Sequence, residues 1–216
     1  MRYIFDPKFD IGRLLPTDRA LRAWALALGT AVLLVGESTD GLAAAARVSV
    51  DDSSFRCITD MMPVRHFYVG NLLGDVSSTV AVAKAGHGDY PIGSVLQLVP
   101  NEVMVKQQKG FSAATRDWEF FFIDVSASGS TIRSRGTTDV NNGVGLNCLA
   151  CHSKARPEFD LVCEQDHGCA SLPFTDKMFG ALQRTDPRCN GAQPVSVDDA
   201  DALREFDKIA KALTHP

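Results

Sequence analysis

Two cysteines and a histidine close together carry the clearest chemical signal in this chain of 216 residues. Cys148 and Cys151 are separated by two residues, and His152 follows directly. Two thiols at this spacing can add to the two vinyl groups of one haem, and the adjacent histidine then lies under the iron. The pattern therefore predicts one covalent c-type haem (heme c), with Cys148 and Cys151 as attachment sites and His152 as the proximal iron ligand.

Two other kinds of site also use closely spaced cysteines. A four-cysteine zinc site could combine Cys148 and Cys151 with Cys163 and Cys169, with His167 as a further ligand. Structural zinc is uncommon, however, where thiols become oxidised. A thioredoxin-like redox pair needs a strand before the motif and a helix that starts at it, whereas glycine and asparagine precede the motif here.

The first 46 residues have the features of a secretory signal. Ala23 to Gly36 is a 14-residue run without a charge, preceded by Arg13, Arg19 and Arg22 and followed by small residues. Such a run is short for a membrane span but typical of a signal peptide. We therefore expect residues 1–46 to direct export, as a cleaved signal or as an uncleaved membrane anchor, and residues 47–216 to form one domain in the periplasm or another exported location.

Six cysteines must be accounted for in an oxidising compartment. If haem uses two of them, the remaining four allow three disulfide pairings. We favour Cys163 with Cys169, which are close in sequence, and Cys57 with Cys189, which would join the two ends of the domain.

Composition and charge leave the functional class open apart from one exclusion. The chain is 45% hydrophobic and 22% charged, as is usual for a globular protein. Its formal net charge of −4 comes without a basic run, so nothing indicates a nucleic-acid partner.

The elements that must position the motif are mainly strands. Runs rich in β-branched or aromatic residues occupy 64–73, 94–99, 102–107 and 118–125. The last three are joined by short connections, which predicts an antiparallel meander, and the run 118–125 is apolar on both faces, so both should be covered. Helices are expected at 76–85 and, with an amphipathic pattern, at 197–213. The sequence thus predicts an α+β fold, mainly antiparallel sheet with a few helices, that holds one haem.

Several motifs, in order, resemble those of the cytochrome P-460 family, which includes the β-type cytochromes c-prime. They cover about 60 residues: YPIGSV at 90–95, EVMVK at 102–106, the stretch from Gly110-Phe111 to Phe121, Arg135-Gly136, and the motif 148–152. The resemblance implies an antiparallel sheet domain with a c-type haem, and members of the family are often dimers, which implies a homodimer.

The resemblance also assigns residues on the distal side of the haem. Members that oxidise hydroxylamine carry a lysine cross-linked to the haem edge, and the matching position here is Leu98. The family's distal acid matches Glu102, a candidate catalytic group. Lys106 and Lys109 are the nearest alternative lysines, and Lys106 shares the strand face of Glu102.

Other residues are weaker candidates for contacts with a haem. Met104 is a potential sixth iron ligand, although a methionine between two valines usually belongs to a core. His87 lies in a glycine-rich turn, where a surface role is more common. Phe120 belongs to an aromatic run of which one face is expected to line the haem pocket.

Three functional hypotheses follow. The first is a cytochrome that transfers electrons, binds a small diatomic gas such as nitric oxide or carbon monoxide, or does both. The second is an oxidoreductase that oxidises hydroxylamine or reduces a peroxide, with Glu102 as proton acceptor. The third is a zinc-bound or disulfide-stapled module without haem. The sequence identifies no redox partner protein.

Overall fold

The computed structural model describes residues 48–164, 166–189 and 195–214. The expected signal at 1–46 lies outside this part of the chain. Six antiparallel strands form one sheet in sequence order, β1-β2-β3-β4-β5-β6. Their bounds are Met62–Val64, Phe67–Asn71, Ser94–Gln97, Glu102–Lys106, Trp118–Ser126 and Gly129–Gly136. The expected α+β class with an antiparallel sheet is therefore confirmed.

The first expected strand is wrong in one respect, because residues 64–73 do not form a single strand. The chain turns at Arg65, whose φ is +52°, and β1 and β2 pair as a hairpin with Val64 opposite Phe67. A positive φ at arginine is uncommon and carries no strong sequence signal. The three strands β3, β4 and β5 are confirmed, whereas β6 was not expected from the sequence.

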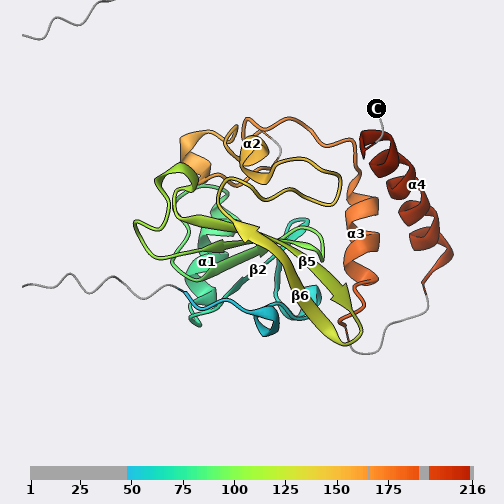
Figure 1. The fold of residues 1–216 in the computed structure, drawn as a ribbon, viewed down its shortest axis with the longest axis horizontal. Helices are drawn as coiled ribbons and strands as arrows, with labels where there is room; N and C mark the ends of the chain where they lie inside the picture. The colour runs from blue at the N-terminus through green and yellow to red at the C-terminus, as the bar shows by residue number, and fades with distance from the viewer. Residues whose placement is uncertain (1–47, 165, 190–194, 215–216) are drawn as a thin grey trace, which may run out of the picture. The chain divides into compact units, whose positions relative to one another are not determined.

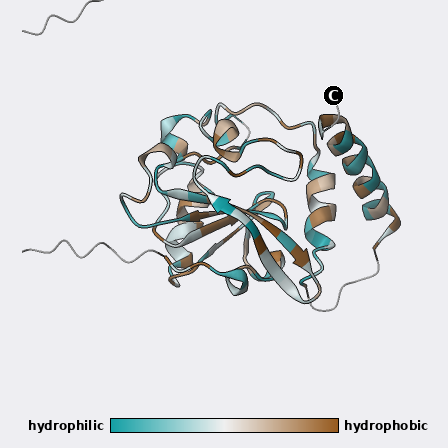
Figure 2. Ribbon diagram, viewed as in Figure 1, coloured by the Kyte–Doolittle hydropathy of each residue, from teal (hydrophilic) through white to brown (hydrophobic). Residues whose placement is uncertain are grey.

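Both faces of the sheet are covered, as the apolar pattern of β5 predicts. Phe120 and Trp118 on one face pack with Met104 and Leu96 from the neighbouring strands. Phe121 and Ile123 on the other face pack with residues of the chain's first described segment, which begins at Val48. In Figure 1 this blue segment and α2 lie on opposite sides of the sheet, and Figure 2 shows apolar residues along β5.

Four α-helices complete the described fold: α1 Val76–Ala85, α2 Cys148–His152, α3 Asp176–Arg184 and α4 Val197–Thr214. The two helices expected from the sequence, at 76–85 and 197–213, are confirmed, and α3 was missed. Figure 1 shows α3 and α4 side by side at one end of the sheet. Single turns of 3-10 helix occur at Asp52–Ser54, Ile58–Asp60, Ala113–Thr115 and Pro157–Phe159.

Both favoured disulfides are present. Cys57 is bonded to Cys189, 132 positions away, and Cys163 is bonded to Cys169. Cys148 and Cys151 remain free thiols. Within the described ranges, none of the helices has the length and apolar character needed to cross a bilayer.

A candidate haem site at helix α2

The short helix α2 begins at the first cysteine of the motif and is held in place by the residue before it. The side chain of Asn147 accepts a hydrogen bond from the Ala150 N–H at 2.9 Å, which caps the helix. Its amide group also donates to the Thr138 carbonyl at 2.9 Å. The backbone N–H of Cys148 donates to the Val140 carbonyl at 3.0 Å, so α2 is tied to the chain that leads into it.

A cavity of about 170 Å³ lies between α2 and the sheet. It is lined by all six residues that the sequence assigned to a haem site: Cys148, Cys151, His152, Leu98, Glu102 and Phe120. Leu96, Met104 and Phe67 add to its mainly apolar wall. Leu146 and Leu172, which are exposed, also border it. Apolar walls of this kind suit the faces of a porphyrin.

The imidazole of His152 is oriented by one short hydrogen bond. Its Nδ1 lies 2.7 Å from the carbonyl oxygen of Leu161. A carbonyl can only accept, so Nδ1 carries the proton and the neutral ring keeps a lone pair on Nε2. Burial lowers the pKa of His152, which favours this neutral form. The ring of Phe120 packs against the imidazole with centroids 5.3 Å apart. The geometry leaves Nε2 as the atom suited to bind a metal.

The two thiols of the motif differ in environment, because Cys148 is half-buried and Cys151 is exposed. Burial, and secondly the nearby carboxyl of Glu102, raise the pKa of Cys148 to about 12. A thioredoxin-like pair needs a lowered thiol pKa. Although α2 does start at the motif, only an isolated bridge between Asn141 and Asn147 precedes it instead of a strand. The raised pKa of Cys148 therefore argues against a thioredoxin-like redox pair.

The structure also argues against a four-cysteine zinc site. Cys163 and Cys169 border the same cavity but are bonded to each other. Nδ1 of His167 lies 2.7 Å from the Val162 carbonyl, and its ring is stacked on Phe159. Nowhere in the part of the chain that the structure describes do three or more His, Cys, Asp or Glu side chains gather in a way that would hold a metal ion.

Glu102 lies at the start of β4, where the cavity beside α2 meets a second one. This neighbouring cavity has a volume of about 460 Å³ and is bounded by the sheet, α3 and α4. Leu98, Glu102, Asn142 and Leu172 line both, so the space open to a large ligand extends beyond the smaller cavity. Burial raises the pKa of Glu102 to about 7, and a hydrogen bond from the Gly143 N–H partly opposes this rise. A carboxyl with such a pKa can gain or lose a proton near neutral pH.

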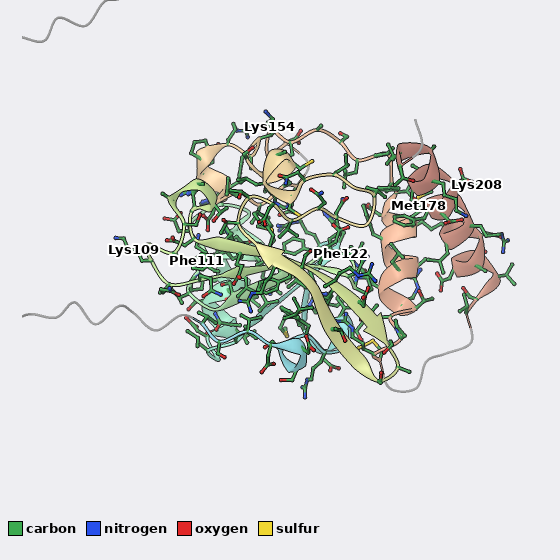
Figure 3. The ribbon with its side chains drawn as sticks, in the orientation of Figure 1. Lys109, Phe111, Phe122, Lys154, Met178 and Lys208 are labelled. Atoms are coloured by element: carbon green, nitrogen blue, oxygen red, sulfur yellow. A yellow bond between two sulfur atoms is a disulfide. The ribbon has the colours of Figure 1, made fainter. Side chains whose placement is uncertain are left out.

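The two alternative lysines do not border the cavity beside α2. Lys106 is buried, and its Nζ lies 2.8 and 2.7 Å from the two carboxylate oxygens of Asp160. Lys109 is exposed on the loop after β4, on the outside of the molecule in Figure 3. The matching position, Leu98, has no amine. None of these three residues therefore presents an amine to the cavity.

Of the two remaining candidates, Met104 borders the cavity and His87 does not. Met104 is buried in the cavity wall and stays a candidate for the sixth ligand. His87 is exposed in the turn after α1 and does not border the cavity. Sequence reasoning missed Asn147 and the Leu161 carbonyl. Asn147 could have been recognised as a helix N-cap, whereas a backbone carbonyl leaves no signal in the side-chain pattern.

Comparison with known proteins gives no independent assignment. No model of a known protein family, no curated protein and no solved structure matches this chain.

Proposed function

We propose that this protein is an exported cytochrome with a single covalent c-type haem, which transfers electrons, binds a small diatomic gas, or does both. One observation carries the proposal: two free thiols and an imidazole with an available Nε2 line one apolar cavity. These are the groups that attach and ligate a c-type haem. The haem, when bound, supplies one-electron redox chemistry and an iron that can bind a small ligand.

The protein residues hold and shield this group. Cys148 and Cys151 would form the thioether bonds, and Nε2 of His152 would bind the iron while Nδ1 keeps its bond to the Leu161 carbonyl. The apolar side chains of Leu98 and Phe67 disfavour charged ligands, because burying a charge without a partner is costly. Neutral molecules such as nitric oxide or carbon monoxide fit this lining best.

The disulfides support the exported location. Disulfides persist in oxidising compartments and are rare in the cytosol of most cells. Both bonds lie within the region that we expect to follow the signal at 1–46. The redox partner protein is not identified, and the homodimer implied by the family resemblance stays a prediction.

Glu102 favours an oxidoreductase as the second candidate function. An enzyme that oxidises hydroxylamine or reduces a peroxide needs a group that accepts or donates protons beside the reacting molecule. Glu102 borders the cavity, and burial raises its pKa to about 7. The amine-free side chain of Leu98 and the ion pair of Lys106 with Asp160 argue against a lysine cross-link, so we rank this function second.

The first test is covalent attachment. Protein produced with working haem-attachment machinery should exceed the mass of its chain by one haem, and Cys148→Ala with Cys151→Ala should abolish the added mass. Cys163→Ala with Cys169→Ala is the matched control, because this pair borders the same cavity but should leave the added mass in place. Haem-free protein that contains zinc would contradict the proposal.

The second test is spectroscopic. We expect an ordinary ferrous c-type spectrum without the red-shifted band of a lysine cross-link, and ready binding of carbon monoxide to the ferrous form. A ferrous protein that does not bind carbon monoxide would mean that Met104 or another ligand occupies the sixth coordination position of the iron. Electron transfer would then be the only remaining function of the first proposal. A red-shifted band that disappears in Lys106→Ala would favour the oxidoreductase instead.

A further inference from the structure

The turn at Asp160 and Leu161 has an unusual backbone. Their φ angles are +48° and +63°, so two successive residues that are not glycine adopt the left-handed region. Side chains disfavour this conformation, and it persists only where the surrounding structure enforces it. Such strained backbone is concentrated at functional sites. The contacts of this turn show what holds it and which group it positions.

A buried network holds the turn. The side chain of Asp160 is fully buried, and both of its oxygens accept from Nζ of Lys106. One of them also accepts from the Tyr90 backbone N–H at 2.9 Å. The Asp160 carbonyl accepts from the indole N–H of Trp118 at 2.7 Å. Lys106 is the last residue of β4 and Trp118 the first of β5, so the turn is anchored to the sheet at the end of this strand pair.

The anchored turn points its next carbonyl at the proximal histidine. Leu161 follows Asp160 directly, and its oxygen lies 2.7 Å from Nδ1 of His152. This is the only hydrogen bond that the structure gives to the imidazole among the described residues. The position of the Leu161 carbonyl therefore determines which tautomer His152 adopts and how its ring is turned.

We propose that Lys106 and Asp160 are a positioning pair that fixes the Leu161 carbonyl and thereby sets the ligand strength of His152. This inference rests on the proposed function for the role of His152. A hydrogen bond donated by Nδ1 makes the imidazole a stronger electron donor, which stabilises ferric iron over ferrous iron. Lys106 thus acts on the haem indirectly, through Asp160 and the proximal ligand His152. This role does not require its amine to reach the porphyrin edge.

Two substitutions separate this role from the effect of charge. Lys106→Met removes a positive charge and Asp160→Asn removes a negative one, and each breaks the ion pair. Charge alone would lower the reduction potential in Lys106→Met and raise it in Asp160→Asn. Loss of positioning weakens the hydrogen bond of His152 in both variants, so the potential should rise in both.

The measurements are made on the holoprotein. Both variants should keep the mass of one haem. The ferric-to-ferrous equilibrium should shift toward ferrous by about tenfold in each, which is 59 mV for a one-electron couple. The iron–histidine stretching frequency of the ferrous form should fall in both. Shifts of the potential in opposite directions, or no shift, would overturn the proposal.

Glu119→Gln is the matched control for general destabilisation. Glu119 is also a buried carboxylate paired with a basic residue, with Nε of Arg135 at 2.8 Å from its Oε1. It lies on β5 but faces the other side of the sheet, and its partners are Arg135 and Gln107. The control should lower thermal stability without changing the iron–histidine frequency. An equal frequency change in the control would also overturn the proposal.

The positioning pair can be tested separately from the proposed function. If the wild-type protein carries no haem, the proposed function fails, and the ring ¹⁵N chemical shifts of His152 then report on the pair in the haem-free protein. The wild type should hold the proton on Nδ1, and both variants should populate the Nε2-protonated tautomer. Unchanged ring shifts in the variants would overturn the inference.

Discussion

At the scale of single residues, Glu102 differs from the other acids because its carboxyl has no basic partner among the described contacts while burial raises its pKa to about 7. Asp124 on β5, by comparison, is exposed and paired with Arg133 at 2.7 Å. Between the ordinary pKa of a glutamate and 7, the folded protein binds a proton at Glu102 that the unfolded chain releases. The contribution of Glu102 to the stability of the fold should therefore fall as the pH rises through this window.

Replacing Glu102 by glutamine tests this prediction. We expect Glu102 to contribute a fall in the free energy of unfolding between pH 4.5 and 7 that approaches about 1.4 kcal/mol per pH unit. His152, whose pKa burial lowers, contributes in the opposite direction below its ordinary pKa, so the comparison with a Glu102 variant isolates the carboxyl. Glu102→Gln should remove that contribution, and Asp124→Asn, as the control, should leave it in place. Urea denaturation at several pH values measures the difference. Parallel pH profiles for the wild type and Glu102→Gln would contradict the raised pKa.

How far single residues were predictable depends on whether their side chains carry the chemistry. The C-x-x-C-H motif is set by the porphyrin itself, so its spacing is visible in the sequence. The structure places Glu102 and Leu98, which the family resemblance assigned, beside that motif. Asp160 was missed because its partner Lys106 lies 54 positions earlier in the chain, and only the fold brings the two together.

At the scale of elements, α2 is too short to be stable alone and depends on its cap. A helix of five residues completes little of the backbone hydrogen bonding that stabilises longer helices. Asn147 therefore matters more to α2 than a cap matters to a longer helix. Asp75 plays the corresponding role for the ten-residue helix α1, where its side chain accepts from the Ser78 N–H.

The two caps provide a matched pair of substitutions. Asn147→Ala and Asp75→Ala should each destabilise the protein by about 1 kcal/mol, measured by denaturation. Only Asn147→Ala should also lower the fraction of protein that carries covalent haem, because it releases the segment with both thiols. Mass spectrometry of freshly produced protein measures that fraction. An equal loss of haem in Asp75→Ala would indicate that general stability, rather than the cap of α2, controls attachment.

The elements that sequence analysis missed have weak patterns. The strand β6 contains one large apolar residue, Ile132, and is the last strand at one edge of the sheet that the described residues form. Its polar residues therefore show little of the apolar and aromatic character that marked β5. Helix α3 lies within residues 156–194, a region rich in glycine, proline and cysteine, and this composition indicates loop rather than helix. Met178 and Phe179 of α3 are buried, and Figure 3 marks Met178 on the helix.

At the scale of the whole molecule, the two disulfides differ in the length of the loop that they close and in their distance from the cavity. The bond between Cys57 and Cys189 closes a loop that contains all six strands of the described sheet and α2, and neither cysteine borders the cavity beside α2. The bond between Cys163 and Cys169 spans only six positions but lies in the cavity wall, directly after the turn that orients His152. Stability and the properties of the haem should therefore depend on different bonds.

The loop lengths set the expected loss of stability. Restriction of the unfolded chain contributes about 5 kcal/mol for the long loop and about 2 kcal/mol for the short one, so Cys57→Ser with Cys189→Ser should lower the melting temperature more than Cys163→Ser with Cys169→Ser. The effect on the haem should have the reverse order. The variant without the Cys163–Cys169 bond should change the rate of carbon monoxide binding to ferrous protein, because it frees the chain beside the Leu161 carbonyl. The variant without the Cys57–Cys189 bond should bind the gas at the wild-type rate while it remains folded. Calorimetry and flash photolysis on the same samples measure the two quantities. A long-loop variant with an altered rate at temperatures well below its melting point would show that the Cys57–Cys189 bond also shapes the haem cavity.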